Sequence, residues 1–407
     1  MNTAHAPTSI IEDAIAHTEA ARHEAPDTTP ATEESLELTL AERDARARAE
    51  ASAAGGVLKK IIETGQRTAG NTIRRVMTEI PVDLITGNKK IGWSFDEHGS
   101  IRLSVDGQDS APYDTDQRIH RHAFGQFATR YNIPVRYLDR LIEGATANAW
   151  ERDLALTTLN GHAKNVGGRV MLRSYQGQVR GVMSDRYRRL DSRPLLDSLL
   201  GALDETGFVV YAGTGSDVKV SIRALKPEIY DIEGDPVVFG LEWTNSDYGA
   251  GKHEVRVYVL RTVCLNGMTG ESIMSNTHLG KRADADLKLS EATRRKEQDY
   301  FSALIREAVI EKAGPVQVEK TIARVRHAAK ERIELGESLP VALRRALSGP
   351  EQERVRALFE SDESVMLPPE PTVHRLSNCL SWMARTASNP ERSMDLEKLA
   401  GSVAGIG

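Results

Sequence analysis

The sequence predicts an α+β fold in which an antiparallel sheet is surrounded by helices. Residues 208–265 alternate between apolar and polar side chains in short runs separated by Gly, Pro and Asp turns, which is typical of antiparallel strands. Residues beyond Ser290 show helical periodicity interrupted by prolines. A hairpin pattern followed by a helix precedes the strands, so the predicted core has the order hairpin, helix, strands, helix.

The hairpin is predicted over residues 169–184, with a two-residue turn at Gln176 and Gly177 that would place Arg173 opposite Arg180. Because side chains alternate along a strand, one face of the ribbon would be apolar and the other basic. The apolar face would consist of Val170, Leu172, Val179 and Met183. The basic face would consist of Arg169, Arg173, Tyr175 and Arg180. We expect a helix to cover one face of the sheet and to leave the other open.

The remaining elements follow from local periodicity and turn residues. A first hairpin is predicted over residues 91–105, around a turn at 96–99. Helices are predicted over residues 71–80, 119–131, 135–142, 145–161 and 195–203, the last capped by Asp191 or Ser192. Strands are predicted over 208–211, 217–224, 237–244 and 254–265, and the last is apolar on both faces and therefore central. Breaks between C-terminal helices are predicted at Gly314-Pro315, Pro340, Gly349-Pro350 and Pro368-Pro369.

Composition divides the chain into four regions. Residues 1–56 contain four Arg, eleven Asp or Glu and no aromatic residue, which predicts a disordered acidic tail with a helix from Glu33 to Ala54 that stops at Gly55-Gly56. Residues 57–163 would form an N-terminal subdomain with a hairpin and helices. Residues 164–289 would form the α+β core, and residues 290–407 a helical C-terminal region.

The overall composition is ordinary, but the charge is unevenly distributed. The net charge is −5, yet residues 57–200 carry +6 (22 basic, 16 acidic) and residues 201–289 carry −4 (9 basic, 13 acidic), which is compatible with binding to nucleic acid. The two cysteines, Cys264 and Cys379, are expected to be buried thiols. The sequence contains neither a run of 18 apolar residues nor a secretory signal at its start, so we expect a cytoplasmic protein without a membrane partner.

A cluster of arginines indicates the ligand class. Between Lys164 and Arg193 there are eight Lys or Arg and two Asp. Like charges that face each other across two strands destabilise a sheet unless an anion lies over them, and neighbouring aromatic rings can stack on bases. We therefore predict a basic groove that binds single-stranded DNA, with contact residues Arg169, Arg173, Tyr175, Arg180, Arg186, Tyr187, Arg188 and Arg189. The alternative is a solvated surface on which nearby acids pair with the arginines, with Asp185 and Asp191 serving Arg186, Arg188 and Arg189.

Signatures of catalysis are absent from the sequence. It contains no Gly-x-x-x-x-Gly-Lys-Ser/Thr loop and no zinc-ligand spacing, and His120 and His122 are two residues apart, which on a helix separates them onto different faces. We expect no enzymatic activity, no metal and no cofactor. Two alternatives stay open, namely a cryptic nuclease that uses Asp235 and Glu242, and an interaction protein that docks a host partner through its acidic tail and C-terminal helices.

Two further segments allow more than one interpretation. Residues 124–142 have the outline of a helix-turn-helix whose second helix would present Arg136, Tyr137 and Arg140, but the same pattern fits a packed helical hairpin. Residues 245–251 form either a long hairpin turn or a loop whose backbone amides contact phosphate.

Four distinctive segments together resemble a phage- and plasmid-associated family that is defined only as a domain of unknown function. They are residues 184–191 (SDRYRRLD), 243–249 (WTNSDYG), 260–267 (LRTVCLNG) and 374–378 (HRLSN), the last followed by Trp382 and by residues 396–401 (LEKLAG). The resemblance spans residues 120–401. It implies a mobile-element setting and supplies no established catalytic residues that could be assigned to this sequence. The order of elements is also similar to the core of phage single-strand annealing proteins, which implies a basic groove, a role in recombination or annealing, and assembly into homo-oligomers.

Overall fold

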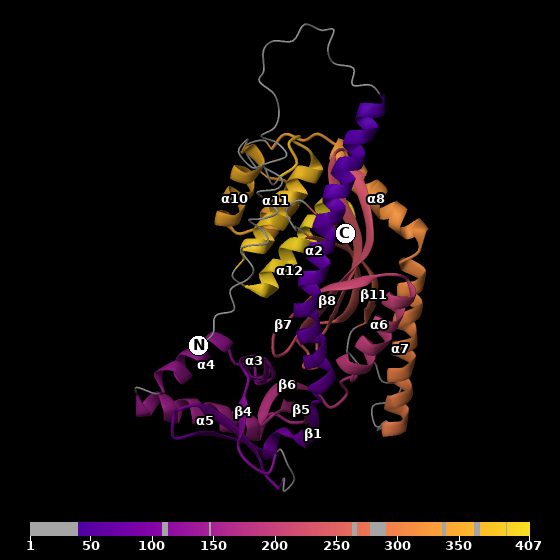
Figure 1. Ribbon diagram of the computed structural model, residues 1–407. Coiled ribbons are helices and arrows are strands. Elements are labelled where there is room, and N and C mark those ends of the chain that lie inside the picture. Colours follow the sequence, from indigo (N-terminus) through magenta and orange to yellow (C-terminus); the bar gives the residue numbers. More distant parts are fainter. Residues whose placement is uncertain are drawn as a thin grey trace.

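The computed structural model describes residues 40–107, 113–145, 148–262, 267–276, 290–335, 339–361, 367–387 and 389–407. It confirms the α+β class, with two sheets that we name sheet A and sheet B. Figure 1 shows each sheet with its own helices, and we call these two units the sheet A body and the sheet B body. Among the described residues, no helix combines the length and the apolar character needed to span a lipid bilayer.

Sheet A has six strands in the order β1-β5-β6-β4-β3-β2, in which β4 and β6 run parallel and the other neighbours run antiparallel. The strands are β1 (Val82–Gly87), β2 (Ile91–Phe95), β3 (Ile101–Val105), β4 (Gln117–Ile119), β5 (Arg169–Tyr175) and β6 (Gln178–Ser184). The helices of this body are η1 (Asn88–Lys90), α3 (Arg121–Arg130), α4 (Val135–Gly144) and α5 (Ala149–Asn165). The predicted first hairpin is confirmed, since Trp93 pairs with Leu103 across β2 and β3. Phe127 of α3 and Leu159 of α5 share one core with the strands, and the sheet crosses the division predicted at residue 164.

The β5–β6 hairpin turns at Gln176 and Gly177, as predicted. Both residues have a positive φ, 49° and 69°, which is the backbone of the type I′ turn that matches the twist of paired strands. A bulge after Arg173 shifts the register, so that Arg173 lies opposite Gly181. The predicted pairing of Arg173 with Arg180 is therefore wrong, because the extra residue of the bulge moves the two side chains out of register.

Helix α2 (Leu40–Thr78) is a single long helix that runs along sheet B and ends where the two bodies meet (Figure 1). It continues through Gly55-Gly56, so the predicted stop at these glycines is wrong. A glycine inside a helix costs about 1 kcal/mol relative to alanine, and the burial of Leu58 and Ile61 against sheet B offsets this cost. Residues 1–39, which make up most of the predicted acidic tail, lie outside the described residues.

Sheet B has five antiparallel strands in the order β11-β10-β9-β8-β7. They are β7 (Val209–Gly215), β8 (Val220–Ile232), β9 (Asp235–Asn245), β10 (His253–Arg261) and β11 (Gly267–Asn276). The first four correspond to the predicted strands. Strand β11 was not predicted, because its sequence is rich in Gly, Ser and Thr and lacks the alternating β-branched pattern of the others.

The helices that follow β6 in the chain pack around sheet B (Figure 1). They are α6 (Ser192–Glu205), α7 (Glu291–Lys312), α8 (Pro315–Lys330), α9 (Val341–Ala346), α10 (Gly349–Glu360), α11 (Val373–Thr386) and α12 (Pro390–Val403). The predicted breaks at Gly314-Pro315 and Gly349-Pro350 are confirmed, since a new helix starts at each of them. Cys379 is buried on α11, as expected, whereas Cys264 lies outside the described residues.

Both faces of sheet B are covered. Phe239 and Val257 share a core with residues of α6 and α7, whereas Val238 and Leu260 share a core with residues of α2. The prediction that β10 is a central strand covered on both sides is confirmed. The expectation that one face of the sheet is open is wrong, because α2 occupies that face.

Candidate nucleic-acid interface

The arginines of the predicted basic face do not share one exposed surface. Arg173 and Arg180 are buried, with 1% and 8% of their surface exposed, whereas Arg169 and Arg186 are exposed. The hairpin face that carries the two buried arginines lies against the end of α2 and the loop between β9 and β10. The expectation of an exposed basic ribbon is therefore wrong for Arg173 and Arg180, because distant parts of the chain cover them.

Arg173 lies at the centre of three aspartates that join the two bodies, and we call this group the aspartate cluster. Its Nε donates to Asp83 Oδ1 on β1 (2.7 Å), and its Nη2 donates to Asp191 Oδ1 at the start of α6 (2.6 Å). Its Nη1 donates to the backbone carbonyl of Asp247 (2.9 Å). The Asp247 carboxylate accepts hydrogen bonds from the backbone N–H and the hydroxyl of Ser192, at 2.7 and 2.9 Å. One guanidinium thus ties β5 to β1, to α6 and to the β9–β10 loop.

The aspartate cluster contains more carboxylates than cations. Arg173 and Arg189 face three aspartates, and Arg189 Nε lies 2.7 Å from Asp83 Oδ2. Burial raises the pKa of Asp247 to about 6, although the charge of Arg173 opposes this. Burial also raises the pKa of Asp83, against the opposing charges of Arg173 and Arg189. The surplus carboxylate is therefore the least favourable charge of the aspartate cluster at neutral pH.

Arg180 makes a second contact between the two bodies, and we call this contact together with the aspartate cluster the junction. Its Nη1 lies 3.3 Å from Glu79 Oε2, just beyond the end of α2, and 3.2 Å from the backbone carbonyl of Asp217 between β7 and β8. Its guanidinium lies 5.1 Å from the ring centroid of Tyr175 and 5.9 Å from that of Tyr248, within the range of cation–π attraction. Tyr175, a predicted stacking residue, is half-buried beside this guanidinium.

Some residues of the segment that follows β6 contribute to the junction, whereas others face the solvent. Arg188 Nε lies 2.9 Å from Glu297 Oε1 on α7, and Arg189 belongs to the aspartate cluster. The Tyr187 hydroxyl donates to a backbone carbonyl of the β9–β10 loop at 3.3 Å, and burial raises the pKa of Tyr187. Tyr187 and Arg189 thus contribute to the junction, whereas Arg186 is exposed.

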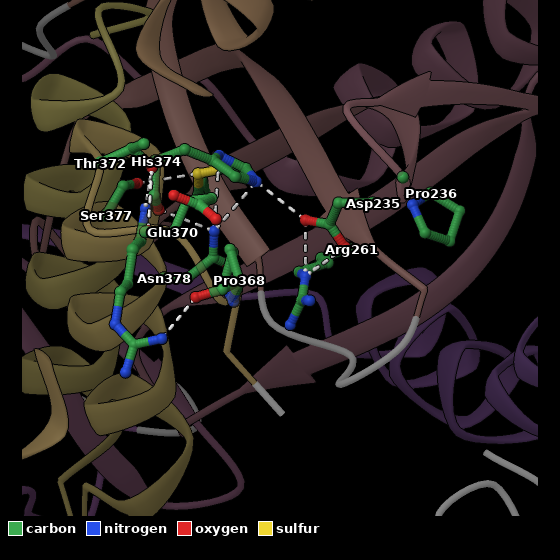
Figure 2. Close-up of polar contacts among 12 residues, drawn as sticks. Asp235, Pro236, Arg261, Pro368, Glu370, Thr372, His374, Ser377 and Asn378 are labelled. Atoms are coloured by element: carbon green, nitrogen blue, oxygen red, sulfur yellow. Dashed lines mark hydrogen bonds and ion pairs between the residues drawn. The ribbon is translucent and has the colours of Figure 1, made fainter. Parts of the chain in front are cut away.

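The four distinctive segments of the sequence meet in two polar clusters. Segments 184–191 and 243–249 supply two of the aspartates that surround Arg173. Segments 260–267 and 374–378 meet in a second cluster, between sheet B and α11 (Figure 2). The unusual residues of these segments therefore hold elements together.

Asp235, at the start of β9, is the centre of the second cluster (Figure 2). His374 Nε2 lies 2.8 Å from Asp235 Oδ2, and Arg261 Nε donates to the two carboxylate oxygens at 2.5 and 2.7 Å. Asn378 donates from its side-chain amide to the His374 carbonyl at 2.9 Å. Burial alone would raise the pKa of Asp235, but Arg261 and His374 hold it below its usual value. The ionised carboxylate thus joins β9, β10 and α11.

Glu242, the other carboxylate considered for a nuclease, is engaged in a similar way. It accepts hydrogen bonds from the hydroxyls of Ser221 and Thr269 at 3.0 and 3.1 Å, and from Arg223 Nε at 3.0 Å. Arg223 also pairs with Glu397 of α12. Burial would raise the pKa of Glu242, but Arg223 and the hydroxyl donors hold it below its usual value. In the part of the chain that the structure describes, no three His, Cys, Asp or Glu side chains gather where they could hold a metal ion.

A cleft of about 1220 Å³ opens between the two bodies. Helix α3 and β6 form one wall, and the turn between β7 and β8 together with the first half of α12 forms the other. Its cationic side chains are Arg121, Arg130, Lys219 and Arg223. Its apolar side chains include Val135, Val182, Val218, Val220 and Met394. No local sequence pattern indicates this cleft, because its lining comes from four separate parts of the chain, namely residues 120–135, 182, 214–223 and 389–397.

The cleft is weakly basic at neutral pH. Its lining contains four Lys or Arg and two Glu, which gives +2 when its two histidines are neutral. Burial lowers the pKa of His120 and of His122, which favours their neutral forms. His122 Nε2 lies 3.1 Å from the Tyr248 carbonyl, and His120 Nδ1 accepts from the backbone N–H of His122, which caps α3.

Helix α4 carries polar side chains outward beside the cleft. Arg136, Tyr137 and Arg140 are exposed, as the helix-turn-helix interpretation expects of its second helix. The first helix of that motif, α3, packs its Phe124 and Phe127 into the core of sheet A. The cleft, the junction and α4 are thus the features from which a function can be argued.

Comparisons of the chain with protein-family models, with curated proteins and with solved structures give no match.

Proposed function

We propose that this is a cytoplasmic, non-enzymatic protein that binds single-stranded DNA in the cleft between α3, the β7–β8 turn and α12. The observation that carries the proposal is the pairing of cations with an apolar lining in one large cleft. Its volume of about 1220 Å³ exceeds the roughly 300–1,000 Å³ of typical small-molecule pockets. A cleft of this size suits a segment of a polymer.

The two kinds of lining match the two parts of a nucleic-acid strand. Arg121, Arg130 and Lys219 of the cleft lining would contact phosphates. Arg121 pairs with Asp139 at 2.8 Å, but 76% of its side chain stays exposed. Arg223 supplies no net charge, since Glu242 and Glu397 flank it. The apolar residues between the cations would contact bases, which in a single strand are free to leave their stack. A duplex keeps its bases covered and would use the phosphate contacts alone.

Two residues of the predicted basic face stay in the proposal. Arg169 and Arg186 are exposed, and the Arg169 carbonyl accepts a hydrogen bond from Arg130 Nη2 at 2.9 Å, which puts Arg169 next to the cleft wall. We propose that the two walls of the cleft are held in place by Arg173, Arg180, Tyr187 and Arg189, whose contacts join the two bodies. The role we propose is recombination or annealing in a mobile element. We propose that the protein acts as a homo-oligomer, and light scattering with and without DNA would measure the size of that oligomer.

Fluorescence anisotropy with a labelled oligothymidine tests the binding at several salt concentrations. We expect log affinity to fall linearly with log salt, with a slope of about −0.7 per phosphate contact. The double variant Arg130→Glu, Lys219→Glu should bind more weakly, and its slope should be smaller by roughly 1.4, which is two contacts of about 0.7 each.

The matched control is Arg345→Glu, Lys320→Glu, which makes the same charge change at exposed positions on α9 and α8. It should bind like the unmodified protein. Equal losses in both double variants would show a response to net charge alone and would reject the cleft as the site. No binding of the unmodified protein at low salt would reject the proposed function itself.

A further inference from the structure

We propose that the cleft closes on the bound strand by a hinge rotation of the sheet A body and the sheet B body about the aspartate cluster. We call this hinge closure the jaw. This inference rests on the proposed function, because it describes how the same cleft engages its ligand. Four observations support it, namely separate cores, few chain crossings, a polar junction and cations on both walls of the cleft.

The two bodies have separate hydrophobic cores. The core of the sheet A body contains Trp93, Phe127 and Leu172, and the cores of the sheet B body contain Trp243 and Tyr258. Among the described residues, no side chain belongs to cores of both bodies. Domains that share little apolar contact move relative to each other by default. A rotation between these bodies therefore leaves either core intact.

The chain crosses between the bodies at residues 79–81, between α2 and β1, and at residues 185–191, between β6 and α6. Both crossings carry residues of the junction, Glu79 in the first and Asp191 in the second. Hinges are formed by a few loop or element-terminal residues of this kind. The two crossings thus place an axis of rotation at the aspartate cluster.

The junction is mainly polar and tightly fitted. A Cβ added to Gly181 would lie 2.8 Å from the Tyr248 carbonyl oxygen, so β6 and the β9–β10 loop approach more closely than any side chain at this position would allow. Around this contact the bodies are held by ion pairs and hydrogen bonds of Arg173 and Arg180. Interfaces between domains that move relative to each other are more polar than permanent ones, which suits a pivot.

Both walls of the cleft carry cationic side chains. Arg121 and Arg130 belong to the sheet A body, and Lys219 belongs to the sheet B body. Glu391 and Glu397 of α12 balance Lys219 and Arg223, so the lining of the sheet B wall has no net charge. A strand between the walls would contact the cations of both, and a ligand that binds the closed form more tightly shifts the bodies toward that form.

Pulsed electron–electron double resonance tests the jaw on the full chain. Spin labels would be attached at Arg140→Cys on α4 and Asp395→Cys on α12, which are exposed and do not line the cleft. Cys264→Ser removes one native thiol, and the buried Cys379 is retained. We expect the distance between the labels to shorten and its distribution to narrow when an oligothymidine is added.

Anisotropy on the same labelled protein separates the two proposals. Binding without a change in the distance would overturn the jaw and leave the proposed function standing, whereas absence of binding would overturn both. A second variant, Arg180→Gln, removes the contacts to Glu79 and to the Asp217 carbonyl and should broaden the distance distribution of the ligand-free protein. A distribution as narrow as that of the parent would contradict a pivot at this junction.

Discussion

At the scale of single residues, Arg173 shows how a charged pattern in a sequence can serve packing. Its partners Asp83 and Asp247 lie 90 and 74 positions away in the chain. The alternation of the hairpin correctly separates an apolar face from a charged one, but it contains no information on what covers the charged face. A buried guanidinium needs its donors satisfied, and here the distant aspartates satisfy them. The predicted contact set therefore includes both junction residues and exposed residues.

Asp247 makes the junction sensitive to pH. Burial raises its pKa to about 6, above the usual value for a carboxyl, so the folded protein binds this proton more tightly than the unfolded chain does. The stabilisation of the folded state by this proton on Asp247 is present below about pH 4 and is lost as the pH rises through about 6. Asp247→Asn keeps an oxygen that accepts from Ser192 and removes the surplus charge. We expect the variant to be more stable at pH 7.5 by roughly 1–3 kcal/mol.

Chemical denaturation between pH 4 and pH 8 measures this effect as a difference between the two proteins. The gap in the free energy of unfolding should be smallest at the acidic end and should widen with pH. Asp197→Asn, an exposed position on α6, makes the same chemical change outside the cluster and should give a constant, small difference. A difference in the free energy of unfolding that does not grow with pH would show that the charge of Asp247 does not destabilise the folded protein.

At the scale of elements, local patterns predicted most helices and strands and failed where tertiary contacts decide. The four predicted strands of sheet B and the helix breaks at Gly314-Pro315 and Gly349-Pro350 depend on turn residues and alternation, which the sequence displays directly. Helix α2 continues through Gly55-Gly56 because sheet B supports its second half. Strand β11 exists because β10 offers an edge to pair with. Neither cause is visible in the segment itself.

The attachment of α11 to sheet B depends on Asp235 (Figure 2). Asp235→Asn would remove the carboxylate charge that faces Arg261 and His374. Breaking a buried ion pair costs about 3–5 kcal/mol, because the remaining charge stays buried. We expect a loss of that order in the free energy of unfolding, together with faster hydrogen exchange in α11.

Glu370→Gln is the matched control, since Glu370 also pairs with an arginine, Arg332, at 2.9 Å. That pair is exposed, with 61% and 71% of the two side chains accessible, so its loss should cost less than about 1 kcal/mol. Equal destabilisation by the two variants, measured by chemical denaturation, would contradict the role given to Asp235.

At the scale of the whole molecule, the division into two bodies could not be predicted from composition. The chain enters the sheet B body with α2, builds the sheet A body between residues 82 and 184, and then returns to sheet B. A boundary drawn along the sequence cannot describe such a path. The cleft is likewise a product of the assembled molecule, because each of its walls belongs to a different body.

Separate cores predict that the two bodies lose structure under different conditions. Among the described residues, the core of the sheet A body contains 18 buried side chains, whereas the larger core of the sheet B body contains 43, and stability rises with the apolar area removed from water. Hydrogen exchange in rising denaturant should therefore show β2 and β3 opening before β9 and β10. Arg173→Met, which removes the tie to Asp83 and Asp191, should widen the interval between the two openings. A single transition shared by all four strands, in both proteins, would mean that the junction couples the bodies into one cooperative unit, and a jaw that pivots there would then have no physical basis.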